Sequence, residues 1–257
     1  MERKFQSKPF YYKVKGEYAL FTDPVTKGGG EKFTYQVPTY QALKGITEAI
    51  YWKPTLIYYI SSVKIINKIT TETKGIRTIF KDGSNDLSYY TYLKNVEYLV
   101  EVYFEWNLKY DNLKQDRQEI KHQQILLRSL EKGGRRDVFL GSRECVAEVE
   151  KITKEEYEKT KSYYEGENLN FGIMFHSFIY PNETEEKIEK LQSTFSQIQM
   201  ENGEIKFIRP EECQIKNELG NYTISEFEYD KNMKNIDKEI LDYKKEGEIN
   251  ECSDSIV

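Results

Sequence analysis

Hydrophobic positions in the first 150 residues switch repeatedly between the two-residue period of strands and the 3.6-residue period of helices. Between residues 89 and 106, apolar side chains fall on alternate positions, which predicts one or two strands. The expected elements are a strand over 11–22, a helix over 39–52, a strand over 55–71, the strands over 89–106, a helix over 117–132 and a strand over 138–150. This β-α-β-β-α-β order predicts an α+β, ferredoxin-like (RRM-like) domain.

The first expected helix ends in a group of side chains suited to ligand contact. Thr39 is placed to cap its N-terminus, and Pro54 ends it because proline disfavours helical geometry in the preceding residue. Tyr51, Trp52 and Lys53 therefore lie where the chain turns away from the helix. An aromatic hydroxyl and a cation at this point favour a ligand site, with Lys53 as an RNA contact. Simple coverage of the core explains the two aromatic residues equally well.

The second expected helix carries its own boundary signals and a charged face. Asp116 and Glu119 match the spacing of a capping box, and glycines at 133 and 134 stop the helix. Arg117, Lys121 and Arg128 fall within an arc of roughly 40° opposite the apolar side. Of these, Arg117 and Arg128 are predicted RNA contacts.

Antiparallel helices on one face of a ferredoxin-like sheet bring the end of the first close to the start of the second. Tyr51 is therefore expected near Lys121 and His122, about 70 positions away in sequence. These side chains suit RNA cleavage without a metal, since histidine transfers protons near neutral pH and lysine stabilises phosphate charge. The competing interpretation is that a lone histidine on a helix is structural, and we interpret His176, in an aromatic strand, in that way.

A glycine-containing loop after the second helix is another candidate RNA-binding segment. Arg135, Arg136 and Arg143 lie within nine residues of one another, and the glycines let an RNA backbone approach closely. A helix cap followed by a strand with solvated arginines is the alternative.

The pattern weakens after residue 150. We expect a strand over 170–180, an acidic amphipathic helix or a long loop over 183–200, and a short hairpin over 201–210. This predicts three parts: a catalytic and RNA-binding domain over 1–150, a small β-rich region over 151–210, and an acidic extension over 211–257 whose last dozen residues are disordered.

The two halves of the chain differ in charge, and the whole chain has a formal net charge of −5. Residues 1–150 carry 24 Lys and Arg against 19 Asp and Glu, whereas residues 151–257 carry 14 against 24. The basic half favours a polyanion partner. No apolar run approaches the roughly 18 residues of a membrane span, so we expect a cytoplasmic protein with no membrane contact. The three scattered cysteines and two histidines predict no metal site and no cofactor.

Several segments, taken in order over residues 10–176, closely resemble the CRISPR-associated Cas-five family, subtype I-C (Dvulg), of the repeat-associated RNA-binding superfamily. The segments are ALFTDP, YQVPTYQALKGITEAIYWKP, EIKHQQILLRSLEKGG and FLGSRECVAEV. Residues 71–80 and the chain after about residue 180 depart from the family pattern.

The resemblance implies an endoribonuclease that cuts precursor CRISPR RNA within repeats, without metal, by 2′-hydroxyl attack. The family's catalytic tyrosine, lysine and histidine match Tyr51, Lys121 and His122. Members of this subtype stay bound to the 5′ handle beside the backbone and large subunits of the type I-C interference complex. Relatives in other subtypes only cap the guide RNA, so a non-catalytic RNA-binding subunit is the alternative.

Overall fold

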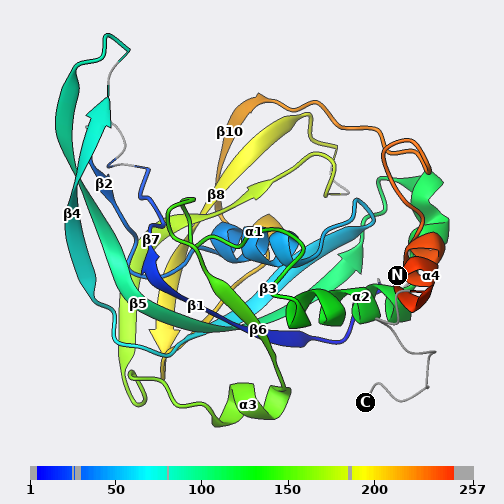
Figure 1. Cartoon of the computed structure of the whole chain (residues 1–257), viewed down its shortest axis with the longest axis horizontal. Coiled ribbons are helices and arrows are strands. Elements are labelled where there is room, and N and C mark those ends of the chain that lie inside the picture. The colour runs from blue at the N-terminus through cyan, green and yellow to red at the C-terminus, as the bar shows by residue number, and fades with distance from the viewer. Residues whose placement is uncertain (1–4, 25, 27–29, 80, 185–186, 246–257) are drawn as a thin grey trace.

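The 22-residue strand β5 (Asn85–Trp106) is central to the sheet in the computed structural model. It pairs antiparallel with β1 (Phe10–Ala19) and β3 (Leu56–Ile65). β6 (Glu148–Ile152) continues the sheet beyond β1, so these strands run in the order β3-β5-β1-β6 (Figure 1). The structure describes residues 5–24, 26, 30–79, 81–184 and 187–245.

The second half of the chain extends the same sheet past β3. β9 (Glu204–Lys206) pairs with β3, β8 (Lys190–Glu201) with β9, and both β7 (Asn168–Ile179) and β10 (Ile215–Asn221) with β8. Short β2 (Lys32–Phe33) is the parallel neighbour of β5, whereas the pairings named above are antiparallel. The described residues therefore form a mixed α/β structure around one mostly antiparallel sheet.

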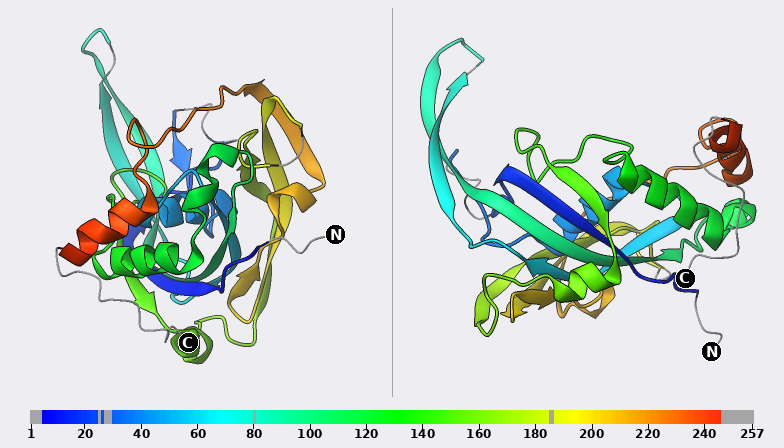
Figure 2. Two further views of the ribbon diagram at one scale, coloured as in Figure 1. Left: turned by 90° about the vertical axis from the view of Figure 1, so that its right-hand side faces the viewer. Right: turned by 60° about the horizontal axis from the view of Figure 1, so that its bottom comes forward.

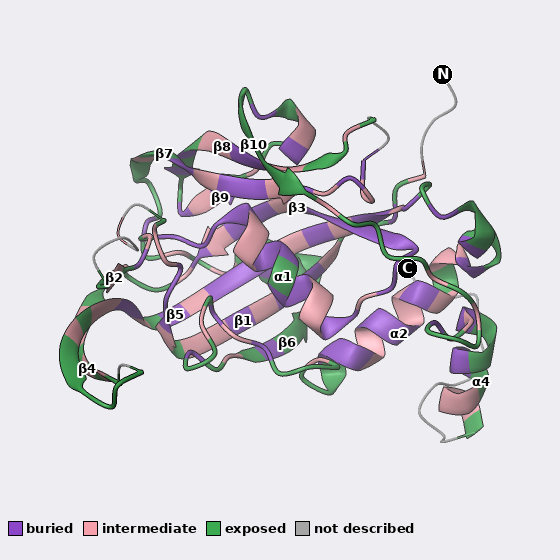
Figure 3. Cartoon of the chain, turned by 90° about the horizontal axis from the view of Figure 1, so that it is seen from above, coloured by how far each residue is buried: buried purple, intermediate pink, exposed green. Residues whose placement is uncertain are grey.

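Helices α1 (Tyr40–Ile50) and α2 (Glu119–Glu131) lie on one face of this sheet, over the buried core (Figure 3). Thr39 caps α1 as predicted, with its hydroxyl accepting the Ala42 N–H at 3.2 Å. The fully buried side chains of this core include Tyr12, Tyr40, Leu43, Ile50, Tyr51, Tyr58 and Phe104. α3 (Lys154–Lys159) follows β6, and α4 (Ile236–Lys245) lies beside α2 at one end of the molecule (Figure 2).

A two-stranded arm projects from the opposite end (Figure 2). It consists of β4 (Thr71–Ile79), which pairs in continuous register with the first residues of β5. The strand expected over 55–71 is too long. β3 already ends at Ile65, and side chains along the arm alternate between exposed and half-buried, so hydrophobicity alone did not reveal its strands.

Two other predicted elements differ from the structure, and two are confirmed. Residues 190–201 form β8 rather than a helix or loop, with Thr194, Ile198 and Met200 buried at a two-residue period. The strand expected over 138–150 is mostly loop, since β6 begins only at Glu148. The strand over 170–180 and the hairpin at residues 202–203 are confirmed.

The predicted disorder of the last dozen residues falls outside the described residues. No helix in the described part of the chain has the length and apolar character needed to cross a membrane.

Candidate active site

Tyr51 follows directly after α1 and is fully buried there. Its backbone leaves the helix in an extended conformation, while its N–H still bonds the Thr47 carbonyl at 3.1 Å. This exit directs the phenol toward α2, where its oxygen lies 2.8 Å from Nδ1 of His122. The sequence prediction that these residues meet across 71 positions is confirmed.

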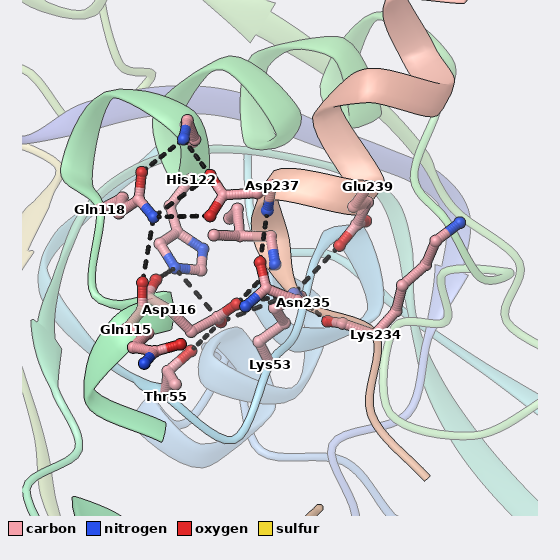
Figure 4. A network of polar contacts seen from close by, with 12 residues as sticks. Lys53, Thr55, Gln115, Asp116, Gln118, His122, Lys234, Asn235, Asp237 and Glu239 are labelled. Atoms are coloured by element: carbon pink, nitrogen blue, oxygen red, sulfur yellow. Dashed lines mark hydrogen bonds and ion pairs between the residues drawn. The ribbon is translucent and has the colours of Figure 1, made fainter. Parts of the chain in front are cut away.

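The contacts of His122 determine which ring nitrogen carries the proton. Nε2 lies 2.7 Å from the backbone carbonyl oxygen of Asp116, which can only accept a hydrogen bond (Figure 4). Nε2 must therefore be the protonated nitrogen, and Nδ1 of the neutral ring accepts the Tyr51 hydroxyl proton. Burial lowers the pKa of His122 to about 3 and raises that of Tyr51 well above its ordinary value. Both groups are thus neutral near pH 7, and the lone pair of Nδ1 is directed at the Tyr51 hydroxyl.

Lys121 points away from this pair, although it is the neighbour of His122 in sequence. Its ammonium forms an ion pair with Asp237 of α4 and donates to the Gln118 side chain. About a third of its side chain is exposed. The structure therefore brings two of the three predicted catalytic side chains into contact and places the third on the adjoining surface.

Lys53 is the most enclosed of the predicted RNA contacts, with 7% of its side chain exposed. Its ammonium lies 3.3 Å from Asp116 and 3.1 Å from Glu239, and it donates to the Lys234 carbonyl at 2.7 Å. This cation joins the exit of α1 to the segment that leads into α4.

Asp116 does not cap α2, and the predicted capping box is wrong. The helix begins two residues later than expected, and its N-cap, Gln118, makes no side-chain capping bond. The buried Asp116 carboxylate instead accepts from Thr55 Oγ1 at 3.0 Å and from the Ile236 N–H at 2.7 Å, besides pairing with Lys53. Burial raises the pKa of Asp116, although Lys53 and these donors oppose the rise.

Arg135 covers the Tyr51 ring. Its guanidinium carbon lies 4.5 Å from the ring centroid, and the group pairs with Glu239 and donates to the Tyr243 hydroxyl at 2.7 Å. The guanidinium of Arg128 lies over the Tyr243 ring at 3.9 Å. Two predicted RNA-binding arginines therefore lie beside the candidate centre, and both contact α4.

The remaining predicted arginines have other neighbours. Arg117 precedes α2 and donates to the carbonyls of Asn107 and Tyr110, each at 3.1 Å. Arg136 contacts the end of α1 through its backbone N–H, and Arg143 places its guanidinium 5.9 Å from the Phe139 ring centroid. Arg117 thus supports the local fold, whereas Arg136 and Arg143 lie exposed in the loop after α2.

Sequence reasoning missed the carboxylates of α4, Asp237 and Glu239. The acidic composition of residues 211–257 suggested a solvated tail, yet Ile236 and Ile240 have helical spacing and Asn235 caps the Asp237 N–H at 2.8 Å. That short signal was available in the sequence. Among the described residues, no three His, Cys, Asp or Glu side chains are grouped as they would be around a metal ion.

Comparison with known proteins identifies the family. The model Cas_Cas5d, described as CRISPR-associated protein (Cas_Cas5), matches residues 11–208. A crystal structure of a CRISPR-associated protein is similar, with a TM-score of 0.72 and 45% identity, covering 84% of this chain and 99% of that one.

Two curated relatives share the name CRISPR pre-crRNA endoribonuclease Cas5d. The Thermus thermophilus protein is 34% identical over 99 residues, which cover 35% of this chain and 42% of the relative. The Mannheimia succiniciproducens protein is 37% identical over 60 residues, or 23% of this chain and 26% of the relative. The chain therefore matches less than half the length of either relative. The family match extends much further, over most of the sequence, and the chain belongs to the Cas5 family of CRISPR-associated proteins, subtype I-C.

Proposed function

We propose that the chain is a metal-independent endoribonuclease that cleaves precursor CRISPR RNA within its repeats and stays bound to the 5′ handle in the type I-C interference complex. The observation that carries this proposal is the buried hydrogen bond between Tyr51 and Nδ1 of His122. The names of the two curated relatives, both pre-crRNA endoribonucleases, support the same activity.

The reaction begins when the 2′-hydroxyl loses its proton and attacks the adjacent phosphorus. Once the site has opened to RNA and water, which relieves the burial that lowers the pKa of His122, Tyr51 passes its proton to Nδ1 of His122 as it takes up the proton of the ribose hydroxyl. Lys121 stabilises the charge on the phosphate. The leaving 5′-oxygen takes up a proton from water, and the proton on His122 returns to the solvent, which leaves a 5′-hydroxyl and a 2′,3′-cyclic phosphate.

The predicted cations bind the RNA backbone around this centre. Lys53, Arg128 and Arg135 lie within one cluster with Lys121, where they can contact phosphates near the cut. Arg136 and Arg143 extend the surface along the loop after α2. Arg117, whose guanidinium bonds two backbone carbonyls, contributes to RNA binding mainly by holding the start of α2.

The β1-α1-β3-β5-α2-β6 unit is a ferredoxin-like fold in this proposal. Its strand order, β3-β5-β1-β6, and its two helices on one face support that assignment. Residues 1–150 then form the RNA-binding and catalytic part, residues 151–210 a β-rich addition, and residues 211–257 an acidic extension. Other subunits of the interference complex are the expected protein partners.

A cleavage assay in excess EDTA tests the proposal with labelled repeat RNA from the neighbouring CRISPR array. We expect a single cut, and none in a parallel RNA with a 2′-deoxy substitution at that position. A cut that requires added metal, or that survives the substitution, contradicts the mechanism.

One observation favours a second function, a non-catalytic subunit that binds and caps the guide RNA. Both Tyr51 and His122 have no exposed surface, so RNA cannot touch either in the arrangement described. Tight binding of the repeat without cleavage in the same assay identifies this alternative.

A further inference from the structure

Helix α4 covers the cations of the candidate site with its own negative charges. Asp237 pairs with Lys121, and Glu239 pairs with both Lys53 and Arg135. We propose that α4 is a self-masking element whose carboxylates occupy the positions of RNA phosphates, and that α4 leaves these positions when repeat RNA binds. The inference rests on the proposed ribonuclease function, and it adds a control of that site from within the chain.

The chemistry of the contacts supports this exchange. Carboxylates and phosphates accept the same charge-assisted hydrogen bonds from lysine and arginine. The side chain of Glu239 is 9% exposed and lies between two cations, where a phosphate would be equally well neutralised. Asp237, half-exposed, contacts Lys121 at the edge of the cluster. Two side chains of one helix thereby neutralise three cations, each of which the proposed function assigns to RNA.

Helix α4 also affects the buried Tyr51–His122 pair, through Arg135. Arg135 lies over the Tyr51 ring, and the partners that hold it there, Glu239 and the Tyr243 hydroxyl, both belong to α4. Departure of the helix removes both partners at once. Arg135 is then free to turn to a phosphate, which uncovers the face of Tyr51.

A segment without regular secondary structure connects α4 to the sheet, and apolar contacts hold the helix in place until RNA binds. Residues 222–228, between β10 and the turn before α4, have no regular secondary structure. Ile236 and Ile240 anchor the helix in the core, and Asp116 accepts the Ile236 N–H. The helix lies beyond residues 11–208, which the family model matches.

The first test measures backbone hydrogen exchange of the full-length protein with and without 2′-deoxy repeat RNA, which binds but is not cut. We expect amides 236–245 to exchange on the order of tenfold faster in the complex, as a displaced helix would. Unchanged or slower exchange in α4, together with RNA binding, means that the helix completes the site and overturns the inference. If RNA fails to bind both wild-type protein and Asp237→Asn, the proposed function fails with it.

Asp237→Asn tests the same inference without removing the helix. Loss of one exposed ion pair is expected to raise repeat-RNA affinity and kcat/KM by about two- to fivefold. Asp242→Asn is the matched control, because Asp242 lies on the same helix and pairs with Lys234 instead. It should leave both quantities within error of wild type. A lower affinity or cleavage rate for Asp237→Asn, with Asp242→Asn unchanged, contradicts masking.

Discussion

The buried Tyr51–His122 pair and the charged cluster beside it are built in opposite ways. The pair is neutral, fully enclosed and fixed by two short hydrogen bonds, one to each ring nitrogen of His122. In the cluster, Lys53, Lys121 and Arg135 are charged, and their carboxylate partners come partly from α4 (Figure 4). The difference indicates that the proton-transfer groups are already in place in the free protein. The phosphate-binding groups are instead paired with carboxylates of the same chain, which RNA must replace.

Removing the Tyr51 hydroxyl should separate the two regions most sharply. Tyr51→Phe is expected to slow repeat cleavage by about 10²- to 10⁴-fold, because the proton route to His122 is lost, while RNA affinity stays close to wild type. Tyr58→Phe is a matched control, since Tyr58 is equally buried and its hydroxyl has no hydrogen-bond partner among the described residues. Single-turnover cleavage and filter binding measure the two effects. Comparable cleavage by Tyr51→Phe and Tyr58→Phe refutes the catalytic role of the pair.

Asp116 joins the two regions, so its loss should affect stability more than any surface charge. Asp116→Ala removes the acceptor of Lys53, Thr55 and the Ile236 N–H. We expect the free energy of unfolding to fall by about 3–5 kcal/mol, because a buried cation loses one of its carboxylates. Urea titration measures the change, and Asp242→Asn should shift it by less than about 0.5 kcal/mol. A small effect from Asp116→Ala indicates that Glu239 alone neutralises Lys53.

The burial of His122 makes stability depend on pH. Its pKa in the folded protein is about 3, below the ordinary value of 6.5, so between these values the unfolded chain binds the extra proton. This contribution is complete above pH 6.5, and it falls by up to about 1.4 kcal/mol per pH unit as the pH drops toward 3. The raised pKa of Asp116 acts in the opposite direction.

Urea titrations of wild type and His122→Gln at pH 7, 5.5 and 4.5 isolate the histidine contribution, because the carboxylates titrate in both proteins. We expect the wild type to lose more stability than the variant at each lower pH. If both proteins lose the same unfolding free energy at each pH, His122 is exposed to solvent. The contrast between a neutral buried pair and a charged cluster then disappears.

The sequence was sufficient for features set by helix order and insufficient for those set by distant charges. The two amphipathic helices and the strands between them predicted that Tyr51 and His122 meet. Asp116 was assigned to a cap because its local spacing fits one, but its partners lie 61 to 120 positions away. The direction of Lys121 depends on Asp237, 116 positions further on, which no local pattern connects to it. An acidic C-terminal region resembles a solvated tail until its docking position is known.

The weakest expected effect concerns the exposed arginines that lie outside the masked cluster. Arg143→Ala is expected to lower repeat-RNA affinity a few-fold and to reduce the slope of log affinity against log salt by about one, with single-turnover cleavage unchanged. Lys154→Ala on α3 is the control, since this exposed cation lies outside the predicted RNA surface. If Arg143→Ala changes the cleavage rate but not the salt slope, Arg143 acts at the phosphate that is cut rather than along the RNA backbone. Equal slopes for Arg143→Ala, Lys154→Ala and wild type instead remove Arg143 from the RNA-binding surface and leave the cations that α4 covers as its main part.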